Sequence, residues 1–349
     1  MYKKMLSVIL ASIVITLSGC SVNENTSTAQ TTSVVSQASA ESASDSTSAF
    51  PLTISHAYGT TTVTSQPTRI VTVGWSNESP VLALGIVPVG ASAANYGAVG
   101  ENGLLPWVTD AYAQLGESNP VVFYDTDGLD FEAISDAQPD IILAPYSGLT
   151  QEDYDTLSQI APTIPYKEKA WATSWREQMS EVAQALGMQS KGDAIVEECE
   201  QILADTIAAY PDLTGKNAAL CWINAADMSS FYVYTPTDPR GSYLEDLGFH
   251  FPESLAALDD GNSFTITVSS EYIDVLNDLD IIITYGDEET LTALQNDPLF
   301  SQVPAVQKGN VVLLDSTSEL AAACNPSVVS IQSGMSNEYM AYIDATYNK

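Results

Sequence analysis

The sequence predicts an α/β fold made of two Rossmann-like lobes with mostly parallel sheets, joined by one long rigid helix. Three observations predict it. From about residue 51 onward, runs rich in β-forming residues alternate with segments of helical periodicity. Each half of the chain carries its own set of such runs, and one long amphipathic stretch separates the halves. We therefore expect lobes over residues 50–185 and 213–349, with a connecting helix over 186–212.

Eight short apolar runs are the expected strands. Continuous aliphatic runs are typical of strands covered on both faces, as in parallel sheets. In the first half the runs are Ile70–Val73, Val87–Gly90, Val121–Tyr124 and Ile141–Ala144, and in the second half they are Ala218–Ile223, Phe231–Tyr234, Ile281–Tyr285 and Val311–Asp315.

One local pattern occurs in both halves. Glu132 opens a short helix, and Asp140 leads into the aliphatic run Ile141, Ile142, Leu143; Glu271 and Asp280 stand in the same way before Ile281, Ile282, Ile283. This imperfect repeat favours two lobes built on a related plan.

The connecting helix is predicted between Gln184 and Tyr210, where apolar or small residues recur three and four positions apart. Pro211 and Gly215 end it. A helix of about 18 residues spans roughly 27 Å at 1.5 Å per residue, so we expect a stiff connection without large hinge closure.

The N-terminal residues predict export. Lys3 and Lys4 precede the apolar run Met5–Leu17, whose thirteen residues are too few for a membrane-spanning helix and suit a signal peptide over residues 1–19. The run ends in Leu17, Ser18, Gly19 and Cys20, which resembles the bacterial lipoprotein box. The expected mature end is thus Cys20, carrying lipid chains such as palmitate. Residues 20–49 are rich in Ser and Thr and predict a disordered tether.

The charge balance excludes several classes of partner. The 44 acidic residues against 11 Lys and Arg give a formal net charge of −33, which disfavours nucleic acid and anionic lipid surfaces. The three cysteines after Cys20 imply no disulfide framework, and Cys199 and Cys221 fit buried apolar positions; the role of Cys324 is open.

Nothing in the sequence points to an enzyme. The chain has only two histidines, and no cluster of His, Cys, Asp or Glu has the spacing of a dedicated metal site. A nucleophile elbow, a phosphate-binding loop and a dinucleotide fingerprint are also absent from the sequence.

Aromatic residues follow several expected strands. Ligands of open α/β sheets bind beyond the carboxyl ends of the strands, so a cleft lined by these aromatic residues is expected between the lobes. Arginine is scarce, and Arg176 and Arg240 are candidates to place a forked donor in that cleft, whereas Arg69 suits the surface. The candidate ligand-binding residues are Trp75, Tyr96, Tyr146, Trp171, Arg176, Trp222, Arg240 and Tyr285.

Several stretches together resemble the iron-siderophore substrate-binding lipoproteins of bacterial ABC importers, a class that includes cobalamin and haem binders. The resemblance extends over nearly all of residues 51–349. Its main stretches are His56–Thr61 with Gln66–Val71, Leu82–Gly90, Phe131–Ala144 continuing to Tyr146–Thr150 and Ile160–Thr163, Asp238–Arg240 with Leu247–Phe249, and Val268–Glu271.

The resemblance implies the class III periplasmic-binding-protein fold, no enzymatic activity, and no cofactor. It implies a monomer that is lipid-anchored on the extracytoplasmic face of the cell membrane. This monomer captures a ferric siderophore in the interlobe cleft and delivers it to an ABC permease with its ATPase. Glu132 and Glu271 match the glutamates by which the family docks on the permease. Because the chain offers few basic residues, we expect a neutral or weakly charged chelate such as a hydroxamate. The alternatives are a cobalamin or haem receptor and, from another class, a surface hydrolase.

Overall fold

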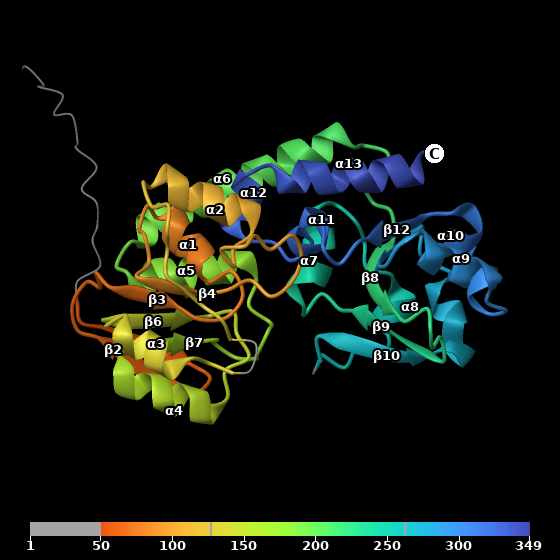
Figure 1. The fold of residues 1–349 in the computed structure, drawn as a ribbon. Helices are drawn as coiled ribbons and strands as arrows, with labels where there is room; N and C mark the ends of the chain where they lie inside the picture. Colours follow the sequence, from red (N-terminus) through yellow and green to blue (C-terminus); the bar gives the residue numbers. More distant parts are fainter. Residues whose placement is uncertain (1–49, 126–127, 262) are drawn as a thin grey trace, which may run out of the picture. The chain divides into compact units, whose positions relative to one another are not determined.

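The computed structural model describes residues 50–349 apart from 126, 127 and 262. The predicted signal peptide (1–19), the lipidation site Cys20 and the tether (20–49) lie outside the described residues. The described chain forms two α/β lobes, each around a five-stranded sheet, and the predicted fold class is confirmed (Figure 1).

The first sheet has the strand order β5-β4-β3-β6-β7, and all its neighbouring strands pair in parallel. β3 and β6 are buried along their whole length, as their continuous aliphatic runs predict. A hairpin, β1 with β2, precedes this sheet. The strands are β1 Leu52–His56, β2 Gly59–Val63, β3 Ile70–Thr72, β4 Gly90–Ser92, β5 Val122–Phe123, β6 Ile141–Ala144 and β7 Thr163–Pro165.

The second sheet has the order β10-β9-β8-β11-β12. β11 pairs in parallel with β8 and β12, whereas β9 is antiparallel to both β8 and β10. One half of this sheet is therefore parallel, and the other half is an antiparallel edge. The strands are β8 Ala218–Ile223, β9 Ser230–Tyr234, β10 Thr265–Ser269, β11 Ile281–Tyr285 and β12 Val311–Leu314.

Helices and short 3₁₀ turns cover the sheets. Those that precede β8 are α1 Glu78–Ala83, α2 Pro106–Gln114, α3 Phe131–Asp136, α4 Gln151–Ile160, α5 Trp175–Ala185 and α6 Gln189–Ala209. Those that follow it are α7 Pro239–Asp246, α8 Glu253–Ala256, η1 Ser270–Leu276, α9 Glu288–Asn296, η2 Phe300–Gln302, α10 Pro304–Lys308, α11 Glu319–Ala323, α12 Val328–Gln332 and α13 Met335–Tyr347.

The repeat seen in the sequence occupies equivalent places in the two sheets. The amide of Asp140, just before β6, donates to the carbonyl of Arg69 at 2.8 Å, and the amide of Asp280, before β11, donates to Asn217 at 2.9 Å. Each aspartate also accepts a hydrogen bond from the amide of that same residue, at 2.9 and 3.0 Å. Both aspartates therefore fix the start of the central strand pair. Glu132 lies on α3, and Glu271 lies on the 3₁₀ turn η1.

The two lobes share one apolar core. The 21-residue helix α6 lies beside the short helix α12 and beside α13 (Figure 1). α12 packs on helices of the first lobe, whereas α13 packs on β12 of the second sheet. Leu203 of α6, Leu143 of the first sheet and Leu220 of the second belong to one buried cluster. The connection between the lobes is thus a packed helical layer rather than a single exposed helix.

Some elements differ from the expectations. β4 begins at Gly90, where the predicted run ended, and β1, β2, β7 and β10 were not predicted. A late segment of the chain also returns to the first lobe, where α12 packs against α1, α2, α5 and α6. Cys199, Cys221 and Cys324 are free and buried, which confirms the prediction for Cys199 and Cys221. Among the described residues, no helix combines the length and the apolar character that crossing a membrane requires.

Candidate binding cleft

A hollow of about 250 Å³ lies where the loops after several strands of both sheets meet. From the first lobe it is lined by Trp75, Asn95, Tyr96, Tyr146 and Trp171, and from later in the chain by Arg240, Phe264, Tyr285, Ala321 and Asn325. Six of the eight predicted ligand-binding residues are in this set. The hollow, called the cleft below, lies at the carboxyl ends of β3, β6 and β11, where open α/β sheets bind ligands.

Close approach of two loops positions Trp75 and Tyr146. Gly74, which follows β3, has a φ of +92°, and a Cβ at this position would lie 2.8 Å from the carbonyl oxygen of Tyr146. The buried Asn77 side chain joins the loops, because its amide group donates to Tyr146 at 2.9 Å and accepts from the Tyr146 amide at 3.1 Å. Gln178 of α5 donates to the same Asn77 oxygen at 3.1 Å. The two aromatic residues are therefore held by a buried polar network.

Trp171 packs over a second glycine. A Cβ on Gly148 would lie 2.4 Å from Trp171 Nε1, so only glycine leaves room for this indole. The Trp171 and Tyr146 rings meet edge to face, with centroids 5.3 Å apart. Trp171 itself has a φ of +60°, and its amide donates to Ser147 at 3.1 Å. The first lobe thus presents a preformed aromatic corner to the cleft.

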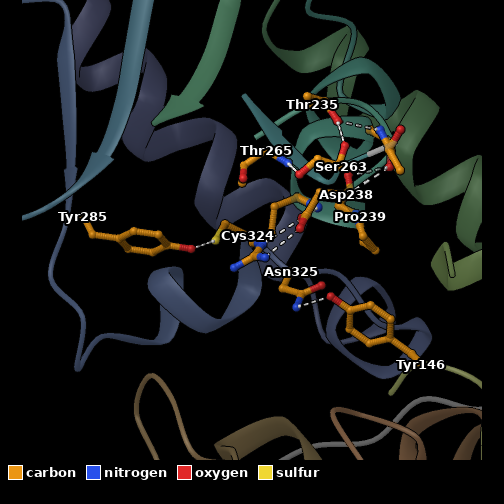
Figure 2. A network of polar contacts seen from close by, with 12 residues as sticks. Tyr146, Thr235, Asp238, Pro239, Ser263, Thr265, Tyr285, Cys324 and Asn325 are labelled. Carbon is orange, nitrogen blue, oxygen red and sulfur yellow. Dashed lines mark hydrogen bonds and ion pairs between the residues drawn. The ribbon is translucent and has the colours of Figure 1, made fainter. Parts of the chain in front are cut away.

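Contacts between early and late parts of the chain close the other side of the cleft. Tyr96 and Tyr285 meet edge to face at 5.4 Å, and the Gly97 amide donates to Ser316 at 3.2 Å. Asn325 donates from Nδ2 to the Tyr146 hydroxyl at 3.1 Å, and the Tyr285 hydroxyl lies 3.3 Å from Cys324 Sγ (Figure 2). Burial raises the pKa values of Tyr146 and Tyr285, so both phenols stay neutral.

Arg240 is the one residue with a formal charge among the described residues that line the cleft. It lies in the first turn of α7 and donates from Nε and Nη2 to the two oxygens of Asp238, at 2.8 and 2.6 Å. Burial alone would lower the pKa of Arg240, but its hydrogen bonds with Asp238 raise it overall. Because Asp238 is fully buried, the pair contributes a directed guanidinium to the cleft with little net charge.

Two residues that line the cleft each carry a buried polar side-chain atom with no hydrogen-bond partner among the described residues. These atoms are the donor Trp75 Nε1 and the acceptor Asn325 Oδ1, both buried from solvent. Buried polar atoms are nearly always paired in folded proteins, and leaving one unpaired costs roughly 1–3 kcal/mol. A ligand that offers both an acceptor and a donor would satisfy them.

Arg176 and Trp222 lie outside the cleft. Arg176 stacks on Trp175, donates to Asp246 at 2.7 Å and also pairs with Glu200, because its place at the start of α5 turns it toward α6 and α7. Trp222 lies on β8 and lines a neighbouring groove. Glu132 and Glu271 are both exposed, one on each lobe. Arg69 is exposed and donates to the carbonyl of Gln138 at 2.7 Å.

Four lining residues were missed in the sequence. Asn95 adjoins the predicted Tyr96, and that was the only available signal. Phe264 precedes β10, a strand that the sequence did not predict. Ala321 lies on α11 and Asn325 in the loop after it, so neither follows directly on a strand end. Neither histidine lines the cleft, and the described residues contain no group of three or more His, Cys, Asp or Glu side chains able to hold a metal ion.

Comparison with protein families gives a match over most of the chain. A family model described as "Periplasmic binding protein" matches residues 70–317. The match agrees with the resemblance found in the sequence, and it covers every strand of both five-stranded sheets and the helix α6.

Individual relatives bind iron chelates according to their names. Among solved structures, PiaA of Streptococcus pneumoniae TIGR4 in complex with ferrichrome is 43% identical, with a TM-score of 0.81 over 85% of this chain and 98% of that one. Among curated proteins, the probable siderophore-binding lipoprotein YfiY of Bacillus subtilis is 28% identical over 292 residues, covering 79% of this chain and 85% of YfiY. The ferric enterobactin-binding periplasmic protein FepB of Escherichia coli is 25% identical over 277 residues, with coverages of 76% and 84%.

Proposed function

This chain belongs to the periplasmic binding protein family, whose members are extracytoplasmic solute-binding proteins rather than enzymes, and from that premise we propose its cargo and its route. We propose that it captures a ferric siderophore in the cleft and delivers it to an ABC importer. No bond is made or broken in this function. Iron travels inside its chelator, and the protein needs no cofactor.

The composition of the cleft is the observation that carries the proposal. Aromatic faces of Trp75, Tyr146 and Trp171 surround a guanidinium, an orphaned donor and an orphaned acceptor. Aromatic walls with a few directed polar groups are typical of small-molecule sites. In this proposal the oxygens of an iron chelate accept hydrogen bonds from Arg240, and small shifts of the lining side chains bring the buried Trp75 Nε1 and Asn325 Oδ1 within reach of its polar groups.

The charge of the cleft favours a neutral ferric hydroxamate. Arg240 is already matched by Asp238, so a strongly anionic chelate would enter without a free cation to pair with, inside a protein of net charge −33. The similarity to PiaA, whose structure holds ferrichrome, supports the same class, because ferrichrome is a ferric trishydroxamate. No observation on the cleft favours cobalamin or haem.

Delivery rests on the two exposed glutamates and on the N-terminus. We assign Glu132 and Glu271 to docking on the two permease subunits, since each lies exposed on its own lobe just before an equivalent strand. We assign Cys20 to lipidation, which would hold a monomer on the extracytoplasmic face of the membrane through the 20–49 tether.

Titration of tryptophan fluorescence with a panel of chelates tests the cargo. We expect saturable quenching by ferric trishydroxamates, and at least tenfold weaker binding of ferric triscatecholates. The double variant Trp75→Ala/Trp171→Ala, measured by calorimetry because it lacks the cleft tryptophans, should weaken hydroxamate binding by about 100-fold, since two buried aromatic contacts of roughly 1–2 kcal/mol each are lost. The matched control is Tyr272→Ala, which removes an aromatic residue that is 64% exposed and away from the cleft.

The opposite pattern contradicts the assignment. Tight quenching by triscatecholates with none by hydroxamates would show that the guanidinium is available to an anionic cargo. A purified protein with a Soret absorption band would make haem the cargo.

A further inference from the structure

An aromatic groove on the second lobe continues from the cleft. It is lined by Trp222, Tyr232, Tyr234, Phe264 and Thr265 and has a volume of about 340 Å³, which exceeds that of the cleft. Phe264 lines both hollows. The groove and the cleft are therefore two parts of one surface.

The groove exists because one helix covers only part of a sheet face. Ala218, Leu220 and Trp222 alternate along β8 and point to the same face. Ala218 and Leu220 are buried in the core with Leu244 of α7, whereas Trp222 is 41% exposed and is the one exposed residue of β8. A large indole that is partly exposed on an otherwise buried strand offers apolar surface to a ligand.

The aromatic residues form a row that leads toward Arg240. Trp222 faces Tyr232 across the antiparallel pair β8 and β9, with ring centroids 5.5 Å apart. Tyr234 lies two residues further along β9, and its ring supports the Arg240 guanidinium at 4.1 Å. Arg240 in turn lines the cleft.

Hydrogen bonds hold Phe264 at the junction of the two hollows. The Thr235 amide donates to the carbonyl of Phe264 at 3.1 Å. The Thr265 amide donates to the Ser263 hydroxyl at 3.2 Å, and the Ser263 carbonyl accepts from the Thr235 hydroxyl at 3.4 Å (Figure 2). The floor that connects cleft and groove is thus fixed before any ligand arrives.

The chemistry of the lining selects the kind of group that fits. Every lining residue is aromatic or a threonine, and none carries a formal charge. Flat apolar groups gain most from such a surface, by burial and by ring stacking, whereas a charged group would lose hydration without a partner.

We propose that the groove binds an uncharged aromatic or acyl arm attached to the iron chelate whose metal centre occupies the cleft. Trp222 and Tyr232 then determine specificity, favouring siderophores with such an arm over compact ones. This inference rests on the proposed function, since it assumes that the cleft holds a ferric chelate.

Calorimetric titration with two matched ligands tests the inference. Both are gallium trishydroxamates of the same scaffold, one without a substituent and one with a neutral naphthoyl arm on its backbone. We expect the arm to tighten binding to the full chain by about tenfold, from roughly 50 Å² of extra apolar burial. The double variant Trp222→Ala/Tyr232→Ala should lose this gain and keep the affinity for the compact ligand, and Tyr272→Ala should retain both.

The outcomes separate the two proposals. Equal affinity of both ligands for the wild-type protein, or a gain that survives in the double variant, overturns the groove assignment while leaving the cleft assignment intact. Failure of the compact ligand to bind overturns both. Sedimentation that shows a dimer, lost in the Trp222→Ala variant, gives the groove a second copy of the chain as its occupant and also overturns the inference.

Discussion

At the scale of single residues, the buried carboxyl of Glu78 makes stability depend on pH. It opens α1, is 5% exposed, and lies near the phenol of Tyr112, whose hydroxyl has no partner among the described residues. Burial raises the pKa of Glu78 from 4.5 to about 7. The folded chain therefore holds a proton here that the unfolded chain releases between about pH 4.5 and 7, so stability should fall across this window as pH rises.

Chemical denaturation of the wild type and of Glu78→Gln between pH 4.5 and 8 checks this prediction. The rise of the Glu78 pKa from 4.5 to about 7 corresponds to about 3 kcal/mol of stability, which the wild type should lose across this window. Glu78→Gln should lose less by about that amount, because Glu181, whose pKa is also raised to about 7, still titrates in both proteins. Glu101→Gln, at an exposed loop position, is the control and should follow the wild type. Parallel stability profiles for the wild type and Glu78→Gln would contradict the assignment.

The position of a cleft residue relative to the strands decided whether the sequence could predict it. Trp75, Tyr146 and Tyr285 follow or end strands, and the geometry of parallel sheets brings those ends to one edge. Trp222 shares its face of β8 with the buried Ala218 and Leu220, so alternation along the strand does not show that it lies outside the cleft and beyond the covered part of the sheet. Asn325 gave no signal because it reaches the cleft from a helix that returns from the second sheet.

At the scale of elements, long apolar runs predicted strands and weakly patterned ones did not. β3, β6, β8 and β11 were found from the sequence because both their faces are covered. The hairpin of β1 and β2 alternates buried and exposed residues over only five positions, and β10 is a half-exposed edge strand. Such strands form because they pair with neighbouring strands, and a single sequence does not show which segments pair.

The helix-start glutamates predict a charge-dependent step outside ligand binding. Glu132 and Glu271 precede structurally equivalent strands, although one lies on α3 and the other on a 3₁₀ turn. Simultaneous reversal to lysine should abolish uptake of the iron chelate in cells, because the proposed docking needs a negative charge at both positions and reversal replaces it with a positive one. Binding of the chelate to the purified variant should be unchanged, since neither residue lines the cleft.

Reversal of two other exposed glutamates, Glu101 and Glu338, is the matched control for net charge and should leave uptake unaffected. Normal uptake by the Glu132→Lys/Glu271→Lys variant would count against docking. Loss of uptake in both double variants would point to net charge rather than to these two positions.

At the scale of the whole molecule, the shared core sets how far the lobes can move. Leu203 of α6 packs in the same cluster as Tyr243 of α7 and Tyr339 of α13, so a large rotation of one lobe would tear apart a continuous apolar interior. Polar ties act in the same direction, because Trp175 of the first lobe donates to Asp246 of α7 at 3.0 Å. The Lys169 ammonium, before α5, also donates to the carbonyl of Gly261, before β10, at 2.5 Å.

Ligand binding should therefore change the distance between the lobes by about 2 Å or less, as expected of a preorganised site. Spin labels at Ser135→Cys on α3 and Gln295→Cys on α9 report this distance by pulsed electron resonance in a chain that carries Cys20→Ser. Both labelled positions are exposed, whereas the three cysteines among the described residues are buried. Gallium chelates keep the ligand diamagnetic. Replacing Leu203 by alanine removes core contacts between α6 and its neighbours, at about 2–5 kcal/mol of stability, and should broaden the distance distribution. A shift of many ångströms in the wild type on ligand addition would mean that the helical layer bends as a hinge.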